Sequence, residues 1–246
     1  TVPGHDQAPM APTGNRILDS LPPAERAQML PKLTLLQLPY GQQLYGLGAR
    51  VTHVYFPQTA LISELVVLSD GRQIEVAAIG RHGFLGLRVA MGVEMETLVS
   101  VTQVPGEAWA MEAMEFQAAL AALPGLRRLV AAYGVVRFIQ VAQFAACHAL
   151  HSLRQRCART LLEVSDQVGA DDFFITQRFL AAMLGVHRPS VTVALRRLQW
   201  AGLISSRRGR IRIRHRAPLV EMACECYRFI IAETNRLLGG ADARSA

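Results

Sequence analysis

The sequence predicts an α+β protein with a β-rich N-terminal half, a long central helix and a basic, mainly helical C-terminal half. Three observations support this class. Short β-type runs separated by glycines occupy residues 33–110, and an apolar stretch with helical periodicity spans 124–151. The charge is also divided unevenly, because residues 1–151 have ten basic and eleven acidic residues whereas residues 152–246 have sixteen and eight.

The chain of 246 residues is long enough for one large domain or two modest ones, and its 51% apolar content predicts a hydrophobic core. We expect a Pro- and Gly-rich disordered tail at 1–14. A β-rich domain should follow at 15–123, then a helix and hinge at 124–152, and a basic domain at 153–246.

The β-rich half contains the runs LTLLQLPYG, HVYFPQ, ALISELVVLSDG, RQIEVAAIG and LVSVTQVPG. Glycines at Gly41, Gly71, Gly80 and Gly106 end most of these runs. Several short strands at such spacing predict an antiparallel barrel or a jelly roll.

Apolar residues in the long helix recur at alternating spacings of three and four over three heptads. This pattern is typical of a core helix within its own domain or of a two-stranded dimer seam. We favour the seam, because the stretch is long and joins two dissimilar halves. Polar residues interrupt it at Arg137, Gln140 and His148, which argues against a membrane span. The expected seam is Leu129, Ala132, Val136, Ile139, Gln143, Ala146 and Leu150.

The segment from Phe174 to Ile204 has the signals of two short helices joined by a turn. Thr176 is a plausible N-cap for the first helix, and Gly185 suits a left-handed turn. Pro189 fits the first turn of the second helix, where no backbone donor is required. The segment therefore predicts a helix-turn-helix.

The second of these helices has one apolar face and one cationic face. An inward arc should contain Val191, Ala194, Leu195 and Leu198. Arg188 should lie at the entrance of the helix. The outward residues are Pro189, Val193, Arg196, Arg197 and Trp200.

The following run LISSRRGRIRIR predicts a hairpin, or wing, with Arg210, Arg212 and Arg214 on one face and Ile211 and Ile213 on the other. Ten arginines and no acid lie between residues 172 and 221. Such a segment favours a polyanionic partner, nucleic acid before membrane, because cationic side chains on rigid elements suit phosphates and groove edges.

With these motifs, the chain resembles the cyclic-AMP receptor protein/FNR (Crp/Fnr) family of bacterial transcription regulators from about 15 to 216. The resemblance is carried by QRCARTLL at 155–162 and ITQRFLAAMLGVHRPSV at 175–191. It implies a cyclic-nucleotide-binding-like double-stranded β-helix at 15–123, a dimerisation helix at 124–152 and a winged helix-turn-helix at 153–246. The segment 219–238 would be an extra C-terminal helix.

The resemblance also implies a homodimer that binds a pseudo-palindromic operator in double-stranded DNA. Arg188 would contact guanine, while Thr176 and Gln177 would contact phosphate. Pro189 stands where relatives often have Glu, and Val193 where they often have a second base-contacting Arg. The expected DNA-binding set is Thr176, Gln177, Arg178, His187, Arg188, Pro189, Ser190, Thr192, Val193, Arg196, Arg197, Arg207, Arg208 and Arg210.

The family's effector pocket is altered in this sequence. Family members that bind cyclic AMP pair a Gly-Glu with an Arg-Ser, whose Arg holds the phosphodiester. Here Leu87 stands near the Glu, and Met95 with Glu96 stands near the Arg. We therefore expect that cyclic AMP is not the effector. The degenerate pocket comprises Phe84, Leu85, Gly86, Leu87, Arg88, Met95, Glu96, Thr97, Val141 and Ala142.

Other site classes are disfavoured, and we expect no cofactor, no metal and no enzymatic activity. The sequence has no N-terminal cysteine cluster for an iron–sulfur centre, and His82 alone is a weak haem ligand. On one helix, Cys224 and Cys226 would not face each other. Cysteines without CxxC spacing are typical of a reduced, cytoplasmic protein.

Two rival functions are a nucleoid-type protein with little sequence preference and, less favoured, a cupin-like enzyme. We expect a small-molecule effector of unassigned identity, RNA polymerase as a partner in the case of an activator, and no membrane partner.

Overall fold

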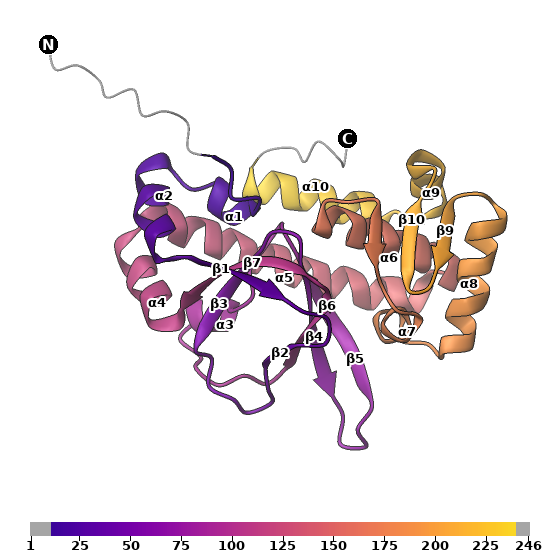
Figure 1. Cartoon of the computed structure of the whole chain (residues 1–246), viewed down its shortest axis with the longest axis horizontal. Helices are drawn as coiled ribbons and strands as arrows, with labels where there is room; N and C mark the ends of the chain where they lie inside the picture. The colour runs from indigo at the N-terminus through magenta and orange to yellow at the C-terminus, as the bar shows by residue number, and fades with distance from the viewer. Residues whose placement is uncertain (1–10, 240–246) are drawn as a thin grey trace, which may run out of the picture.

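The computed structural model describes residues 11–239, and Figure 1 shows its β-rich domain, its long helix and its smaller C-terminal domain. The expected α+β class with a sheet-rich N-terminal domain is confirmed. The expected tail at 1–14 lies mostly outside the described residues.

The N-terminal segment packs on the β domain through two short helices, α1 (Arg16–Asp19) and α2 (Pro23–Met29), and a 3-10 turn, η1 (Leu30–Lys32). Asn15 caps α1 and donates hydrogen bonds at 2.8 Å to the carbonyl oxygens of Pro57 and Gly83.

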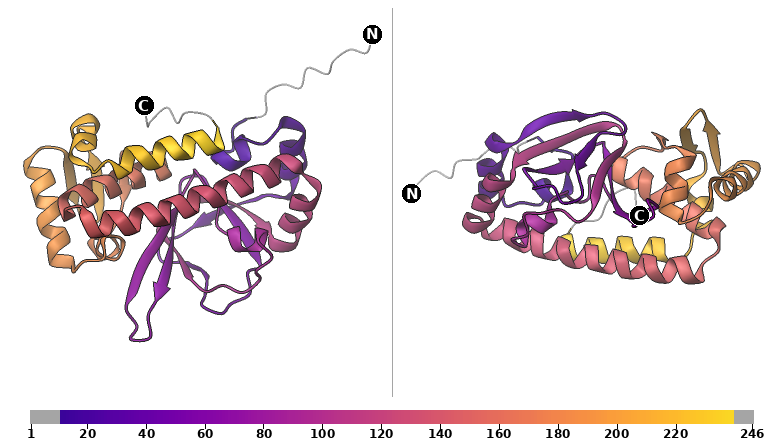
Figure 2. Two further views of the ribbon diagram at one scale, coloured as in Figure 1. Left: turned by 180° about the vertical axis from the view of Figure 1, so that it is seen from behind. Right: turned by 90° about the horizontal axis from the view of Figure 1, so that it is seen from below.

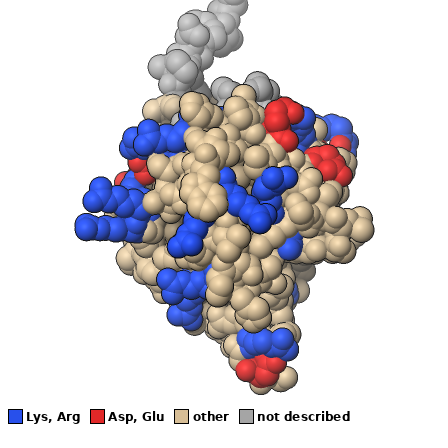
Figure 3. Space-filling view, turned by 90° about the vertical axis from the view of Figure 1, so that its right-hand side faces the viewer, with Lys and Arg blue, Asp and Glu red and all other residues tan. Residues whose placement is uncertain are grey.

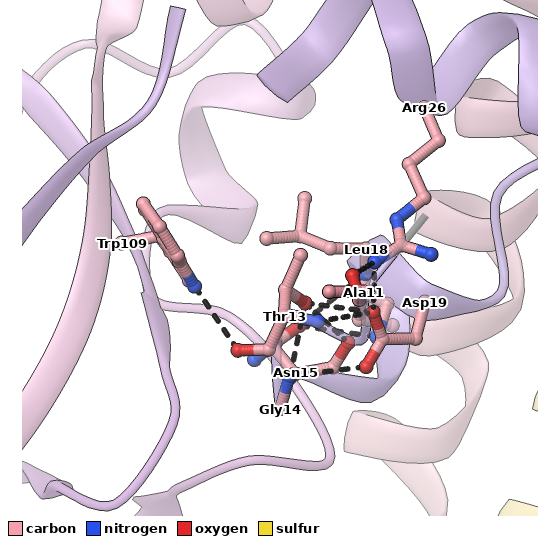
Figure 4. A network of polar contacts seen from close by, with 9 residues as sticks. Ala11, Thr13, Gly14, Asn15, Leu18, Asp19, Arg26 and Trp109 are labelled. Atoms are coloured by element: carbon pink, nitrogen blue, oxygen red, sulfur yellow. Dashed lines mark hydrogen bonds and ion pairs between the residues drawn. The ribbon is translucent and has the colours of Figure 1, made fainter. Parts of the chain in front are cut away.

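The network around Asn15 corrects the boundary of the expected tail (Figure 4). The backbone N–H of Thr13 donates to Asp19 at 2.8 Å, and the Trp109 indole donates to the Thr13 carbonyl at 3.1 Å. Thr13 and Gly14 are therefore part of the folded domain, because their backbone groups have partners within it.

Two antiparallel sheets form the β domain, with strand orders β1-β7-β3 and β2-β6-β4-β5. A cluster of Phe56, Phe84 and Phe116 fills the space inside, with ring centroids 5.4 to 6.1 Å apart. The four-residue helix α3 (Leu87–Ala90) lies between β5 and β6. The strands are β1 (Thr34–Leu38), β2 (Gln43–Tyr45), β3 (His53–Pro57), β4 (Leu61–Val67), β5 (Gln73–Ile79), β6 (Val99–Val104) and β7 (Gly106–Glu112).

Two helices lead out of the β domain, α4 (Ala113–Ala122) and the long α5 (Pro124–Leu150). After α5 the chain is extended at His151, and Ser152 begins α6 (Leu153–Val168) with a capping box. Helix α5 is long and apolar enough to cross a membrane by composition alone, although Arg137 within it pairs with Glu64 of β4 at 2.9 Å.

The C-terminal domain contains α6, the helix-turn-helix and a small sheet of order β8-β10-β9. Its elements are β8 (Asp172–Phe174), α7 (Gln177–Leu184), α8 (Arg188–Trp200), β9 (Ile204–Arg207), β10 (Arg210–Ile213) and α9 (Arg216–Met222). One apolar core joins these elements, with Leu161, Leu180 and Leu198 fully buried.

The expected extra helix at 219–238 is instead two helices, α9 and α10 (Cys226–Leu238). An extended residue, Ala223, ends α9 and turns the chain. Helix α10 then runs back beside α5, as both views of Figure 2 show. Its last residue, Leu238, packs in the core of the β domain, and Asn235 accepts a hydrogen bond from Arg16 at 2.9 Å. Helix α10 therefore ties the C-terminal domain back to the N-terminal one.

Candidate nucleic-acid interface

The turn of the helix-turn-helix forms as its local sequence predicts. Thr176 caps α7 by accepting a hydrogen bond from the Phe179 backbone N–H at 3.2 Å. Gly185 ends the helix with φ of 60°, a left-handed conformation that glycine adopts at little cost. Pro189 lies in the first turn of α8.

Helix α8 has the two faces predicted from the sequence. Val191, Ala194, Leu195 and Leu198 are buried. The opposite face is exposed. The apolar arc packs the helix against the domain core and leaves the cationic face in contact with solvent. The exposed residues are His187, Arg188, Pro189, Val193, Arg196, Arg197 and Trp200.

Two residues of the expected interface contact each other across the helix-turn-helix. The Thr192 hydroxyl donates to the Gln177 side-chain oxygen at 2.9 Å and lies 3.3 Å from the Arg188 carbonyl. Ser190 lies in the same first turn and is partly buried. The contact between Gln177 and Thr192 therefore joins the start of α7 to the first turns of α8.

The wing is a β9–β10 hairpin closed by a two-residue turn. Both turn residues have positive φ, 49° at Arg208 and 79° at Gly209, as a type I′ turn requires. Ile211 and Ile213 point into the core, as predicted. The turn projects Arg207 and Arg208 into solvent.

The arginines of the wing are not equivalent. Asp172 on β8 pairs with Arg210 at 2.8 Å and with Arg212 at 2.6 Å, and these hydrogen bonds, that of Arg212 first, lower the pKa of its carboxyl group. Within residues 11–239, Arg207 and Arg208 make no ion pair. Arg207 and Arg208 are therefore more available to bind phosphate than Arg210 and Arg212.

Figure 3 shows the end of the molecule that bears this domain: Lys and Arg lie across the face, and Asp and Glu lie at its margins. The exposed arginines that the helix-turn-helix contributes are Arg178, Arg188, Arg196 and Arg197. In the part of the chain that the structure describes, none of these four forms an ion pair. The free guanidinium groups make this face suited to a phosphate backbone.

The expected effector pocket contains an internal ion pair. Arg88 on α3 contacts Glu96 at 3.1 Å, and the Glu96 carboxylate is buried. The same carboxylate accepts hydrogen bonds from the backbone N–H groups of Thr97 and Leu98 at 2.8 and 3.0 Å. The guanidinium that could bind a phosphodiester is thus already neutralised.

The other expected pocket residues do not converge on one cavity. Phe84 and Leu85 are buried in the core, whereas Met95 is exposed. Val141 and Ala142 are exposed on α5. Gly86, with φ of 116°, approaches Val54 closely, and Leu87 lies near Gly134 of α5.

The expected dimer seam on α5 is partly wrong. Leu129 and Val136 are buried in the core of their own domain, and Gln143 donates a hydrogen bond to Cys226 Sγ at 3.1 Å. Ala132 and Ile139 are partly buried, and among the expected residues Ala146 and Leu150 are exposed. The helix uses this face mainly to pack on its own chain.

A neighbouring face of α5 is apolar and exposed. Phe138 is 76% exposed, and Val135 is 48% exposed. The residues Ala131, Val135, Phe138, Ala142, Ala145 and Ala149 continue it at spacings of four and three. The sequence could not separate the two faces, because both are apolar with the same period.

A partly open cavity of about 240 Å³ lies at the junction between the domains. Its lining includes Glu75 of β5 and Arg159 and Glu163 of α6. Glu75 accepts a hydrogen bond from the Ser63 hydroxyl at 2.5 Å, and burial raises its pKa to about 8. Arg159 pairs with Glu163 at 2.6 Å.

The prediction that Cys224 and Cys226 point apart is also wrong. It assumed that both lie within one helix, but Cys224 lies in the link between α9 and α10 and Cys226 begins α10. The link lets both thiols face Cys147 and His151 at the end of α5.

Comparison with known proteins agrees with this architecture. Residues 155–222 match the family described as Crp-like helix-turn-helix domain. No curated protein sequence matches the chain. Among solved structures, FixK2 from Bradyrhizobium japonicum has a TM-score of 0.67 at 19% identity, over 78% of this chain and 98% of that one.

Two other structures share the fold. The c-di-GMP responsive global regulator CLP from Xanthomonas campestris has a TM-score of 0.58 at 19% identity, over 77% of this chain and 98% of that one. A CRP-family transcriptional regulator from Thermus thermophilus, TTHB099, has a TM-score of 0.54 at 21% identity, over 76% and 96%. Residues 155–222 therefore form a Crp-like helix-turn-helix domain, and the described chain shares the fold of these solved Crp/Fnr-type structures.

Proposed function

We propose that the protein binds a pseudo-palindromic operator as a homodimer, with Arg188 of each protomer in the major groove. The observation that carries this proposal is the position of Arg188. It is the first residue of α8, it is exposed, and the buried arc of the same helix holds it in a fixed orientation. The N-terminal residues of a recognition helix are those that contact base edges in helix-turn-helix proteins.

Different residues would supply different parts of the binding energy. Arg188 would form a bidentate contact to guanine, and Val193 could offer only apolar contact, for example to a thymine methyl. Pro189 has no backbone donor. Thr176, Gln177, Arg178, His187, Ser190, Thr192, Arg196 and Arg197, together with Arg207, Arg208 and Arg210 of the wing, would contact or orient the phosphate backbone.

We place the dimer contact on the exposed apolar face of α5, centred on Phe138. An exposed apolar stripe on a long helix is costly in water, and heptad spacing suits burial against a second copy of the same helix. The domain division that we propose is a sensor domain from Thr13 to residue 123, a dimerisation helix and hinge at 124–152, and a DNA-binding part from residue 153 on.

Cyclic AMP would not be the effector of this regulator. The Arg88–Glu96 pair supports its exclusion, because a phosphodiester would have to displace a buried carboxylate from its cationic partner. A different small molecule would act as effector, and RNA polymerase would be a partner in the case of an activator. The free cysteines and the DNA partner support a cytoplasmic location.

A footprint on genomic DNA tests the proposal. We expect protection of discrete sites with two-fold symmetry, whose half-sites lie about one helical turn apart. Uniform coating of DNA without preferred sites would contradict sequence-specific binding and would favour the nucleoid-type function.

A further inference from the structure

Three cysteines and one histidine converge at the hinge between the domains. Cys147 lies in the last turn of α5, and His151 is its C-cap. Cys224 and Cys226 come from the link into α10. Their four ligand atoms all lie within 4.8 Å of one another, although the two pairs are far apart in the sequence.

Two pairs of ligand atoms in this cluster have the separation of neighbouring ligands in a mononuclear tetrahedral site. Cys147 Sγ lies 3.5 Å from Cys224 Sγ, and Cys226 Sγ lies 3.6 Å from His151 Nδ1. Zinc bonds of about 2.3 Å to sulfur and 2.0–2.1 Å to nitrogen, in tetrahedral geometry, place neighbouring ligand atoms about 3.5–3.8 Å apart. An iron–sulfur cluster would need its thiolates further apart, because several atoms lie between them.

The surroundings of the four residues are those that metal ligands commonly have. The Nε2 atom of His151 lies 3.1 Å from the Glu225 carboxylate, so a proton on Nε2 leaves Nδ1 to face the thiols. Gln143 donates a hydrogen bond to Cys226 Sγ at 3.1 Å. A carboxylate behind a histidine and an N–H donor to a thiolate both orient ligands and tune their basicity.

Burial makes the cluster a closed site. Cys147, Cys224 and Cys226 are nearly inaccessible to solvent, and they form a small core of their own. The side chain of His151 is only 17% exposed. Four protein ligands without an open position are typical of structural zinc rather than catalytic zinc.

We propose that Cys147, His151, Cys224 and Cys226 bind one Zn²⁺ ion in a structural Cys₃His site. The ion would join the C-terminal end of α5 to the start of α10 directly at the hinge that precedes α6. Binding would stabilise the arrangement in which α10 lies along α5, and loss of the ion would loosen the link between the winged domain and the rest of the chain.

The direct test is metal analysis of the full chain, purified under reducing conditions without chelator. We expect one zinc per chain in the wild type. Cys226→Ser and His151→Ala should each weaken zinc binding at least tenfold, and Glu225→Gln should weaken it about 10- to 100-fold, as expected when a carboxylate that orients a metal-binding histidine is lost. Cys157→Ala is the matched control, because Cys157 is a buried cysteine of α6 outside the cluster, and it should retain one zinc.

A second measurement needs no variant and is therefore independent of folding defects. X-ray absorption at the zinc edge of the wild type should show three sulfur ligands and one nitrogen. A wild type that binds no stoichiometric zinc when supplied with the ion, or a zinc shell without sulfur, would overturn the proposal. Unchanged zinc binding in both Cys226→Ser and His151→Ala would overturn it as well.

Discussion

Arg88 and Glu96 form an ion pair, with the two side chains 3.1 Å apart and the carboxylate buried, in the segment that we expect to correspond to the cyclic-AMP pocket of the Crp/Fnr family. We expect calorimetric titration with cyclic AMP to show no saturable binding. Micromolar affinity for cyclic AMP, coupled to tighter DNA binding, would show that the pair opens and that our account of this pocket is wrong.

The same pair predicts a stability effect. Arg88→Ala removes the cation from a carboxylate that keeps its two backbone donors, so the free energy of unfolding should fall by about 1–3 kcal/mol. Denaturant unfolding measures this change. The exposed pair Arg72–Asp70 is the control, since Arg72→Ala should change stability by less than about 1 kcal/mol.

Exposure on α5 reverses the roles expected from the sequence for two neighbouring residues, since the expected seam residue Val136 is buried and Phe138, outside that seam, is exposed. Phe138→Glu should give a folded monomer, because Phe138 is 76% exposed in one chain. Val136→Glu should destabilise the fold itself, because Val136 is buried in the core of its own domain. Sedimentation and circular dichroism check both outcomes. A stable dimer of Phe138→Glu would place the dimer contact elsewhere.

Wing arginines should affect DNA binding without changing base preference. Arg207→Ala and Arg208→Ala should each weaken binding to all sequences and reduce the salt slope by about one. Arg210→Ala should have a smaller effect, since Arg210 is held by Asp172. Binding measured over a series of salt concentrations tests the difference, and an Arg210 effect larger than both others would contradict it.

Glu75 should make stability depend on pH. Burial raises the pKa of its carboxyl to about 8 in the folded chain, above its ordinary value. Between about pH 4 and pH 8 the folded state holds a proton on Glu75 that the unfolded state has lost. The free energy of unfolding contributed by Glu75 is therefore fully present below about pH 4 and is lost as the pH rises through about 8. Glu75→Gln should remove this loss of stability toward higher pH. Thermal unfolding of both proteins between about pH 5 and 9 measures it. Parallel curves for the two would disprove the assignment.

The helix-turn-helix was predictable because its signals are local. Thr176, Gly185 and Pro189 each specify a backbone conformation within a few residues of themselves, and the arc of Val191 to Leu198 needs only the period of one helix. The hairpin turn at Arg208 and Gly209 belongs to the same class of local signal.

Features that depend on distant contacts were not predictable. Part of the expected seam on α5 is buried within its own chain, because packing of α10 and the β domain, rather than periodicity, decides which apolar face is covered. The cysteine cluster was missed because it needs a break in the helix at Ala223 and the return of Cys224 to Cys147. The pairing of Arg210 with Asp172 likewise follows from the register of β8 and β10.

The central claim is that Arg188 determines which DNA sequence the protein recognises. Affinity measurements on a panel of single-base operator variants test it most directly. For Arg188→Ala we predict a loss of roughly 1–3 kcal/mol on the preferred operator and relaxed preference at one base position in each half-site. Arg207→Ala on the same panel should lower all affinities together. A uniform loss for Arg188→Ala, with an altered base preference for Arg207→Ala, would contradict the claim.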